Sequence, residues 1–332
     1  METSSGENSI DVVLPWVDGS ESLWQIDYQK YSNGKKFDAE RFRDWDNLKY
    51  VFRSIEKNMP WVRKVFFITA GHIPDFLNLN CSKLVHVKHA DYIPEEYLPT
   101  FNSHSIELNF HRISDLSENF IYFNDDTFAL NNIGSEYFFK NNLPVDYMIM
   151  NPIYGGGIEH HLLSNICVIN RGFNNKYHLK TLKNLFRLDY GTDFIRNLAL
   201  MPWKKYTGFY DPHSPLPYKK KTFKDVWDFD FSILNDSCIT KHRELTDVNQ
   251  YLYRYWRLCA GEFFNKNNKN FTCFISLQDD HMNLATSIIK NNNKYKMLCL
   301  NDSGSIINFA KCKKEIIDAL NTRFPEKSIF EV

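Results

Sequence analysis

Two adjacent carboxylates, Asp125 and Asp126, are the strongest candidates for chemistry in this chain. They follow Asn124 directly after the apolar run 119–123. A hard cation such as Mg²⁺ or Mn²⁺ prefers carboxylate, phosphate and water oxygens, and it neutralises a diphosphate that it bridges. The alternative is a turn or a helix cap, because Asn and Asp favour both. The pair therefore indicates either a metal site or a structural turn.

Three further side chains suit phosphoryl transfer, although each also has a structural interpretation. Asp302 follows the apolar run 297–300, and it either completes a metal or acceptor site or forms a turn. His213 lies among prolines on a loop, and its ordinary pKa suits a general base, whereas a lone loop histidine is usually just exposed. Arg243 carries a planar fork that binds phosphate, and its alternative is a surface ion pair.

A second group of candidates could bind the nucleotide part of a substrate. In the segment WVDGS, Trp16 could stack on a base beside Asp18 and Gly19, or the segment could simply form a turn. Asn102 could touch a sugar or cap the helix that follows it. The sequence lacks the GxGxxG, GxxxxGK[ST] and GxSxG patterns, which are the usual marks of dinucleotide oxidoreductases, P-loop ATPases and α/β-hydrolases.

Strands that alternate with helices must position these residues. The first half of the chain contains unbroken apolar runs of strand length and two amphipathic stretches, which is typical of a mostly parallel sheet with helices on both faces. In such sheets ligands bind at the carboxyl ends of the strands, where both VDG and NDD fall. The predicted strands are 11–14, 64–69, 84–87, 119–123 and 147–150, and the predicted helices are 44–57, with Asp44 as N-cap, and 103–113.

The second half is less regular up to about residue 241. After it we predict a helix at 245–258, strands at 271–275 and 296–300, a helix after Asp279 and a last helix at 310–320. We expect a loose tail at 1–9 and a single catalytic domain at 10–332. Its parts are a nucleotide-sugar and metal part (10–150), an acceptor part that is irregular and helical (151–270), and a return to the sheet (271–332).

Composition narrows the class of protein. Lys and Arg together number 40, as do Asp and Glu, and this balance argues against a chain that coats nucleic acid. The seven cysteines are scattered without a CxxC pair, which favours reduced thiols in the cytoplasm. No run reaches the roughly 20 apolar residues that span a bilayer. We expect a soluble cytoplasmic enzyme, and peripheral contact with the inner face of the membrane stays compatible with the sequence.

Four blocks of sequence together resemble the Stealth family, which includes bacterial capsular polysaccharide phosphotransferases. They are also similar to the catalytic core of the animal N-acetylglucosamine-1-phosphotransferase. The blocks are IDVVLPWVDGS, the stretch from FRDWDNLKYVFRSIEKNMPW through LPTFNSHSIELNFHRISDLSENFIYFNDDTF, the pair DPHSPLPY and KHRELTDVNQYLYRYW, and KMLCLND. The resemblance runs over residues 10–332.

The resemblance implies a Rossmann-like fold related to glycosyltransferase-A enzymes and a transferase of phosphorus-containing groups. Hexose or N-acetylhexosamine 1-phosphate would pass from a UDP-sugar to a hydroxyl of a glycan or a lipid-linked oligosaccharide, with release of UMP and with Mg²⁺ or Mn²⁺ as cofactor. Carried over residue by residue, the family pattern points to Asp126, His213, Arg243 and Asp302 as catalytic residues. Asp125, Asp126 and Asp302 are the metal ligands expected.

The sequence departs from the family pattern in two places. Pro15 stands where the family often has Thr, and Ser303 and Gly304 follow Asp302, so a second carboxylate is not expected there. The large insertions of the animal enzyme are absent, which favours a glycan acceptor over a protein. An ordinary UDP-sugar glycosyltransferase that releases UDP, a glycan-binding module without catalysis and a metal-dependent phosphodiesterase stay open as alternatives.

Overall fold

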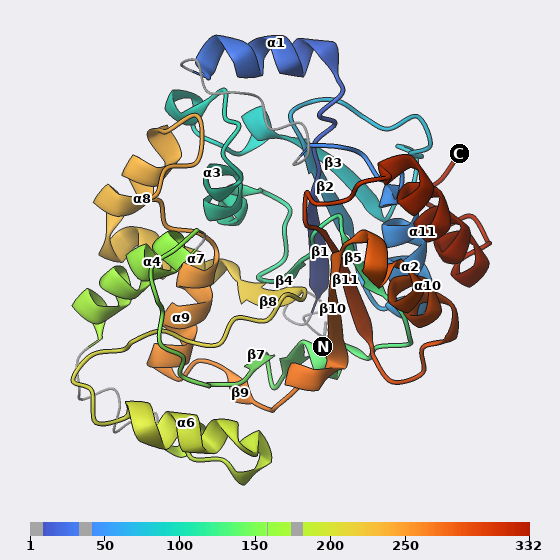
Figure 1. Ribbon diagram of the computed structural model, residues 1–332. Coiled ribbons are helices and arrows are strands. Elements are labelled where there is room, and N and C mark those ends of the chain that lie inside the picture. Colours follow the sequence, from blue (N-terminus) through green and yellow to red (C-terminus); the bar gives the residue numbers. More distant parts are fainter. Residues whose placement is uncertain (1–8, 33–41, 158, 174–181) are drawn as a thin grey trace, which may run out of the picture.

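The main sheet of this computed structural model has the strand order β3-β2-β1-β4-β8. The structure describes residues 9–32, 42–157, 159–173 and 182–332 (Figure 1), so most of the predicted tail at 1–9 lies outside it. The first four strands of this order run parallel, whereas β8 runs antiparallel to β4. The strands are β1 (Ile10–Pro15), β2 (Val65–Thr69), β3 (Leu84–Lys88), β4 (Asn119–Tyr122) and β8 (Leu216–Lys219).

The strand order creates a switch point between β1 and β4. From β1 the chain moves outward through β2 to β3, and it then returns to the other side of β1 as β4. Val13 pairs with Phe66 on β2 and with Tyr122 on β4, so the carboxyl ends of β1 and β4 lie side by side. In a Rossmann-like sheet this is the edge where ligands bind. The predicted α/β class and mostly parallel Rossmann-like sheet are confirmed.

Both faces of the main sheet are covered, which explains why its strands are unbroken apolar runs. Val12 and Leu14 of β1 pack into one hydrophobic cluster, and Val13 between them packs into the other. Figure 1 shows α2 (Leu48–Asn58), α10 (Met282–Asn291) and α11 (Phe309–Arg323) on one side, and α3 (Ser103–Leu108), α7 (Lys220–Phe229), α8 (Phe231–Ile239) and α9 (Tyr251–Ala260) on the other. The prediction of helices on both faces is thus confirmed.

A second sheet joins the end of the chain to the acidic pair. Its order is β10-β11-β5, where β10 is Thr272–Leu277, β11 is Met297–Asp302 and β5 is Thr127–Ala129. Strand β5 begins directly after Asp126 and pairs antiparallel with β11, with Thr127 opposite Cys299. This pairing brings the Asn-Asp at the end of β11 to the switch point of the main sheet. The segment 271–332, predicted to return to the sheet of the first part, instead forms this separate sheet together with β5.

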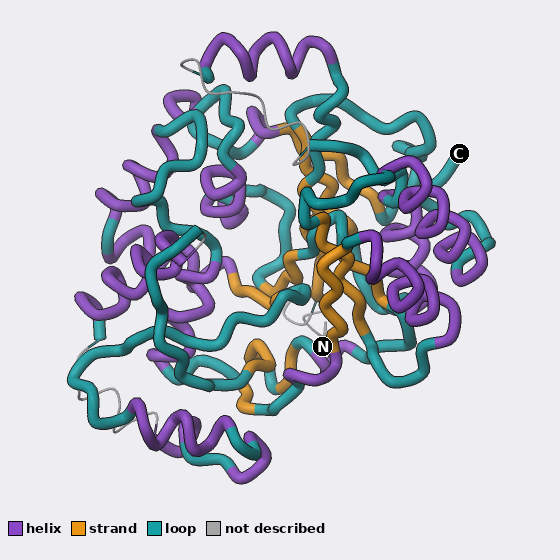
Figure 2. Tube along the Cα trace, in the orientation of Figure 1, coloured by secondary structure: helices purple, strands orange, loops and turns teal. Residues whose placement is uncertain are grey.

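The remaining elements lie around these two sheets. A small sheet has the order β6-β7-β9, and Arg254 and Arg257 of α9 both donate to Asp146 at the end of β7 (2.9 and 2.6 Å). Figure 2 shows how much of this part of the molecule is loop. No helix among the described residues is long and apolar enough to cross a membrane. The elements are β6 (Phe139–Lys140), β7 (Leu143–Asp146), β9 (Phe264–Asn265), α1 (Ser22–Tyr31), α4 (Glu159–Gly172) and α6 (Asp193–Leu200).

The predicted strand 147–150 is wrong, because side chains bond to two of its backbone amides and its pairing with another segment is limited to an isolated bridge between Met150 and Phe209. Strand β7 ends at Asp146. The amide of Met148 then donates to the Tyr190 hydroxyl (3.0 Å) and the amide of Met150 donates to Asn197 Oδ1 (2.7 Å). These residues are buried as a loop whose apolar side chains fill the core. Burial alone therefore gave them the pattern of a strand.

Three predicted helices differ from the observed ones at an end. Asp44 does not cap α2; its carboxylate accepts from the amide of Asp46 in a preceding turn, and the N-cap is Asn47. Helix α3 ends at Leu108, because the side chain of Asn109 donates to the carbonyl of Ser105. The helix predicted at 245–258 begins only at residue 251.

Candidate active site

Three cavities meet at Asp126, at the carboxyl ends of β1 and β4. The largest, of about 390 Å³, is lined by Trp16, residues 42–45 and 47, Asp125 and residues 300–304. A second, of about 300 Å³, lies toward α3 and is lined among others by Trp16, Phe101, Glu107, Asp125 and Arg243. The third, of about 80 Å³, contains His213, Gln250, Tyr251 and Asn301. Asp126 lines all three, so it is the residue that every part of this site shares.

The end of β4 and the start of β5 hold the acidic pair. The Thr127 hydroxyl donates to Asp126 Oδ1 (3.0 Å), the Cys299 thiol lies 3.5 Å from Oδ2, and the Leu300 amide donates to the Asp126 carbonyl (2.9 Å). Burial, together with the charge of Asp126, raises the pKa of Asp125 to about 7. Burial also raises the pKa of Asp126. Neither carboxylate forms an ion pair with a cationic side chain in the described part of the chain.

The third predicted metal ligand, Asp302, already has a cationic partner. Arg43 donates to both of its carboxylate oxygens (2.5 Å each), and Trp45 Nε1 and the Gly304 amide add further bonds (2.9 Å each). Burial would raise the pKa of Asp302, but these hydrogen bonds outweigh it and lower that pKa. The guanidinium of Arg43 also stacks on the ring of Phe309, at 4.5 Å. Asp302 thus lines the same cavity as the acidic pair with its charge compensated.

The acidic pair has the donor chemistry of a divalent-cation site. Burial raises the pKa of both carboxylates, and neither has a cationic partner among the described residues. A hard cation that binds between them would stabilise their ionised forms. Within the described residues, no group of three or more His, Cys, Asp or Glu side chains is placed to hold a metal. The pair would therefore supply two ligands, and Mg²⁺ commonly takes its others from phosphate and water.

His213 lies in the smallest cavity with Asp126. Its ring packs against Phe274, with ring centroids 4.4 Å apart. Burial lowers its pKa and the charge of Asp126 opposes this effect, with a net lowering. His213 is thus neutral at physiological pH, as a general base must be before it accepts a proton.

Arg243 faces the second cavity from a loop that packs on α3. Its Nε donates to Ser103 Oγ (3.1 Å), and Nη2 also donates to this hydroxyl. Four residues further along α3, Glu107 lines the same cavity and accepts from the Tyr122 hydroxyl (3.0 Å). Burial raises the pKa of Glu107, and the charge of Arg243 opposes that rise. The site thus contains a buried carboxylate on the arginine side as well.

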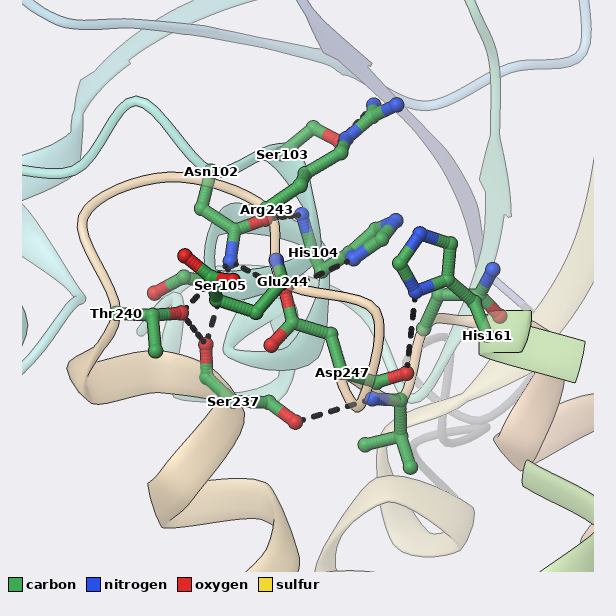
Figure 3. Close-up of polar contacts among 12 residues, drawn as sticks. Asn102, Ser103, His104, Ser105, His161, Ser237, Thr240, Arg243, Glu244 and Asp247 are labelled. Carbon is green, nitrogen blue, oxygen red and sulfur yellow. Dashed lines mark hydrogen bonds and ion pairs between the residues drawn. The ribbon is translucent and has the colours of Figure 1, made fainter. Parts of the chain in front are cut away.

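A buried polar cluster beneath Arg243 holds its loop in place (Figure 3). Asp247 Oδ2 accepts from Asn102 Nδ2 (2.8 Å) and from the Glu244 amide (3.0 Å), and it lies 3.4 Å from His104 Nδ1. The Asp247 carbonyl lies 3.3 Å from His161 Nδ1. Burial lowers the pKa of His104 to about 4. These contacts join α3, α4 and the Arg243 loop.

Asn102, predicted to cap a helix or to touch the sugar, has the first of these roles. It is fully buried, and its Oδ1 accepts from the His104 amide as the N-cap of α3. Its Nδ2 donates to Ser237, Thr240 and Asp247. Because its amide is fully used inside the protein, we assign it no contact with a substrate.

In the WVDGS segment, Trp16 lines cavities of the site, whereas Asp18 and Gly19 have structural roles. Trp16 lines both larger cavities and stacks on Phe67, with centroids 5.9 Å apart. Asp18 Oδ1 accepts from the amide and hydroxyl of Ser20, and Asp18 lines none of the three cavities. A Cβ on Gly19 would lie 2.4 Å from Phe42 Cβ, so only glycine fits there. Asp18 and Gly19 therefore form the turn that positions Trp16.

Arg43 and Glu107 are the site residues that the sequence analysis did not identify. Arg43 reaches Asp302 across 259 positions of the chain, a distance at which no local pattern connects two residues. Glu107 shares a helix face with Ser103, but Ser103 becomes part of the site only through its contact with Arg243, so this spacing alone gave no signal for Glu107.

Comparison with known proteins gives one family. Stealth protein CR1, conserved region 1, matches residues 8–36, and Stealth protein CR2, conserved region 2, matches residues 41–146. The chain is 39% identical over 330 residues to the capsular polysaccharide phosphotransferase WcwK of Streptococcus pneumoniae, covering 97% of this chain and 98% of the relative. It is 34% identical over 335 residues to the exopolysaccharide phosphotransferase cps2G of Lactiplantibacillus plantarum, covering 99% and 98%.

Among solved structures, the chain aligns with the galactosyltransferase LgtC in complex with donor and acceptor sugar analogs. That alignment has a TM-score of 0.38 and 10% identity, and it covers 93% of this chain and 95% of the other. The fold class rests on the strand order described above.

Proposed function

This chain belongs to the Stealth family, and from that premise we propose that it transfers a sugar 1-phosphate from a UDP-sugar to a hydroxyl of a growing capsular or cell-wall polysaccharide. The products are UMP and a phosphodiester between the two sugars. The relatives named above are capsular and exopolysaccharide phosphotransferases, which supports phosphotransfer in glycan synthesis. The convergence of three cavities on Asp126 carries the finer proposal, because it joins a metal-type donor set, a base and a phosphate-binding arginine at one place.

In this proposal, the residues of the site divide the work of one displacement at phosphorus. An acceptor hydroxyl attacks the β-phosphorus of the donor, and the bond from that phosphorus to the bridging oxygen breaks to release UMP. His213 accepts the proton of the attacking hydroxyl. Arg243 stabilises the charge on the transferring phosphoryl oxygens. The sugar C1–O bond stays intact, so the anomeric configuration of the donor is retained.

Bound by Asp125 and Asp126, a divalent cation such as Mg²⁺ or Mn²⁺ would neutralise the diphosphate of the donor. We assign Asp302 a role through Arg43, because it holds that guanidinium at the wall of the largest cavity. Trp16 offers an aromatic face for the uracil base in the same cavity. A glycan or a lipid-linked oligosaccharide is the acceptor. All seven cysteines are free, which fits a place in the reducing cytoplasm.

The decisive experiment separates the nucleotide products. The purified protein is incubated with a panel of UDP-sugars, Mg²⁺ and a capsule-type oligosaccharide, and released nucleotides are resolved by ion-exchange chromatography. We expect UMP together with a phosphodiester in the product. UDP would identify an ordinary glycosyltransferase, and sugar phosphate formed without acceptor would identify a phosphodiesterase.

Two variants make this assay specific for the site. Asp126→Ala should release no UMP, whereas Asp280→Ala, which removes an exposed carboxylate outside the three cavities, should behave as the wild type. If a broad panel of donors and acceptors yields no product with the wild type, the glycan-binding module is the better interpretation.

A further inference from the structure

The segment 182–205, which contains α6, exposes large apolar side chains to solvent. The exposed fractions are 90% for Leu188, 64% for Ile195, 57% for Trp203 and 41% for Leu198. Figures 1 and 2 show α6 at the periphery of the molecule, lower left, well away from the main sheet. Single exposed apolar residues are ordinary, but several within one short segment indicate an interaction surface.

The inner face of this segment is fastened to the body, so its outer face is fixed. Asn197 is fully buried, and its Nδ2 donates to the carbonyls of Met148 (3.0 Å) and Leu185 (2.9 Å). One turn earlier, Asp193 accepts from Lys269 (2.8 Å). Because Ile195 and Leu198 are three residues apart on the same helix, they share its outward face. They cannot turn into the core while these bonds hold.

The charge of the segment is positive. It contains five basic and two acidic residues. Both acids are paired, Asp189 with Arg187 (2.8 Å) and Asp193 with Lys269. The exposed lysines at 183, 204 and 205 have no acidic partner within the described part of the chain. The segment that exposes the apolar side chains therefore carries a net positive charge.

This combination matches the surface of an anionic bilayer. Aliphatic side chains and Trp lie at the boundary of headgroups and acyl chains, and Lys extends its amine toward lipid phosphates. Helix α1 exposes Leu23 (69%) and Ile26 (61%) to a similar degree, yet Glu21 and Asp27 accompany them and offset its one lysine, Lys30. Charge thus distinguishes the α6 segment from the other apolar helix face and makes a lipid surface its fitting partner.

We propose that segment 182–205 is a membrane-docking surface that binds anionic lipid headgroups and holds the protein against an anionic bilayer. This inference rests on exposure and charge alone, and it holds whether or not the proposed reaction is correct. A bilayer as partner requires that binding depend on both the apolar face and the lysines.

The test is co-sedimentation of the full chain with vesicles of phosphatidylcholine, with and without 30% phosphatidylglycerol. We expect binding only to the anionic vesicles, with weakening at high salt. Each basic residue near such a surface contributes about 1 kcal/mol, so Lys204→Glu with Lys205→Glu should weaken binding at least ~10-fold. Ile195→Glu with Leu198→Glu should abolish it, because two charged side chains then replace the inserted apolar ones.

The matched control is Leu23→Glu with Ile26→Glu on α1, which makes the same change at equally exposed sites and should leave binding unchanged. Circular dichroism melts confirm that each variant is folded. Equal loss in the α1 control, or no binding of the wild type to anionic vesicles, would overturn the proposal. Light scattering gives the third outcome: if Ile195→Glu with Leu198→Glu converts a dimer to a monomer and vesicle binding is absent, the surface is a protein interface instead.

Discussion

The acidic pair and the Arg243 loop face the same cavity, but their charges are held in opposite ways. Asp126 accepts from one hydroxyl and one thiol, and neither Asp125 nor Asp126 has a cationic partner in the described chain. Arg243 donates to Ser103 and is attracted by the charge of Glu107. It lies on a loop that is held by hydrogen bonds to the buried carboxylate of Asp247. The acidic pair therefore has no compensating positive charge among the described residues, whereas the hydrogen bonds and charge partners of Arg243 are already in place.

This difference indicates which groups must come from outside the protein. A preorganised charge stabilises a transition state without reorganisation, so the arginine side is ready before any ligand arrives. Two unpaired carboxylates repel each other and any phosphate nearby. In the proposed reaction the acidic side would therefore need a bound cation, and the two sides should respond differently to substitution.

Loss of Asp126 should have the largest effect. Because this residue lines every cavity of the site, we expect Asp126→Ala to lower kcat by at least ~1,000-fold, comparable to loss of an essential charge in phosphoryl transfer. The midpoint of urea unfolding should stay the same or rise, since an uncompensated buried charge is removed. A fall in stability of several kcal/mol would show that the acidic pair is structural. EDTA should reproduce the kinetic loss in the wild type, and Mg²⁺ should reverse it.

Substitution of Arg243 comes next. We expect Arg243→Ala to lower kcat about 100- to 1,000-fold in the nucleotide-release assay. Arg243→Lys should recover little of this, because a lysine lacks the planar fork and can make only one contact to the Ser103 hydroxyl or to a phosphate. Activity of the lysine variant close to wild type would mean that only the charge is needed.

Asp247→Asn tests whether the buried cluster acts through Arg243. The change removes the negative charge that strengthens these buried hydrogen bonds and puts an amide donor in place of one carboxylate oxygen, which should cost about 1–3 kcal/mol of stability. We expect kcat to fall about 10-fold with little change in donor KM. In a double-mutant cycle, adding this change to Arg243→Ala should lower kcat no further. Additive losses would show that the cluster serves the fold alone.

The smallest effect concerns pH, and it arises in the same cluster. Burial lowers the pKa of His104 to about 4, whereas an unfolded histidine titrates near 6.5. Between these values only the unfolded state binds the proton, so stability is complete above pH 6.5 and is lost as the pH falls. At pH 5 the loss from this group is about 2 kcal/mol.

Urea titrations of the wild type and His104→Asn at pH 7 and pH 5 measure this contribution. The variant should lose less stability between the two pH values than the wild type does. An equal loss in both would show that His104 titrates normally in the folded protein.

The sequence was a good guide wherever burial produces its pattern directly. Strands β1 and β2 are buried on both faces, so their sequences are unbroken apolar runs. Asn124 and the acidic pair indicated correctly where β4 ends. The same pattern misled at 147–150, because a side-chain hydroxyl and a side-chain amide bond to two backbone amides there, and strand-like pairing is limited to one bridge at Met150. Helix α9 begins late for a related reason, since Asn249 accepts from the amide of Tyr251 and Ser237 from that of Val248.

The candidate site was predicted in its types of residue, but not in their pairing. Asp126, His213, Arg243 and Asp302 are the catalytic residues that the sequence predicts, and each lines at least one of the three cavities, although their roles stay predictions. Their charge partners were not identified, because Arg43 and Asp302 meet only after the second sheet has formed. Whether an aspartate is free to bind a metal depends on such a long-range contact, which a single sequence does not encode locally.

The antiparallel pairing of β5 with β11 also determines at which stage of synthesis the candidate site can form. Strand β5 is made well before the backbone of Leu300, whose amide donates to the Asp126 carbonyl. A nascent chain can fold its first parallel strands while its catalytic edge still lacks one wall. A chain that has been made only as far as β5 therefore lacks one wall of the candidate site, and the site is complete only after β11 has been made and has paired.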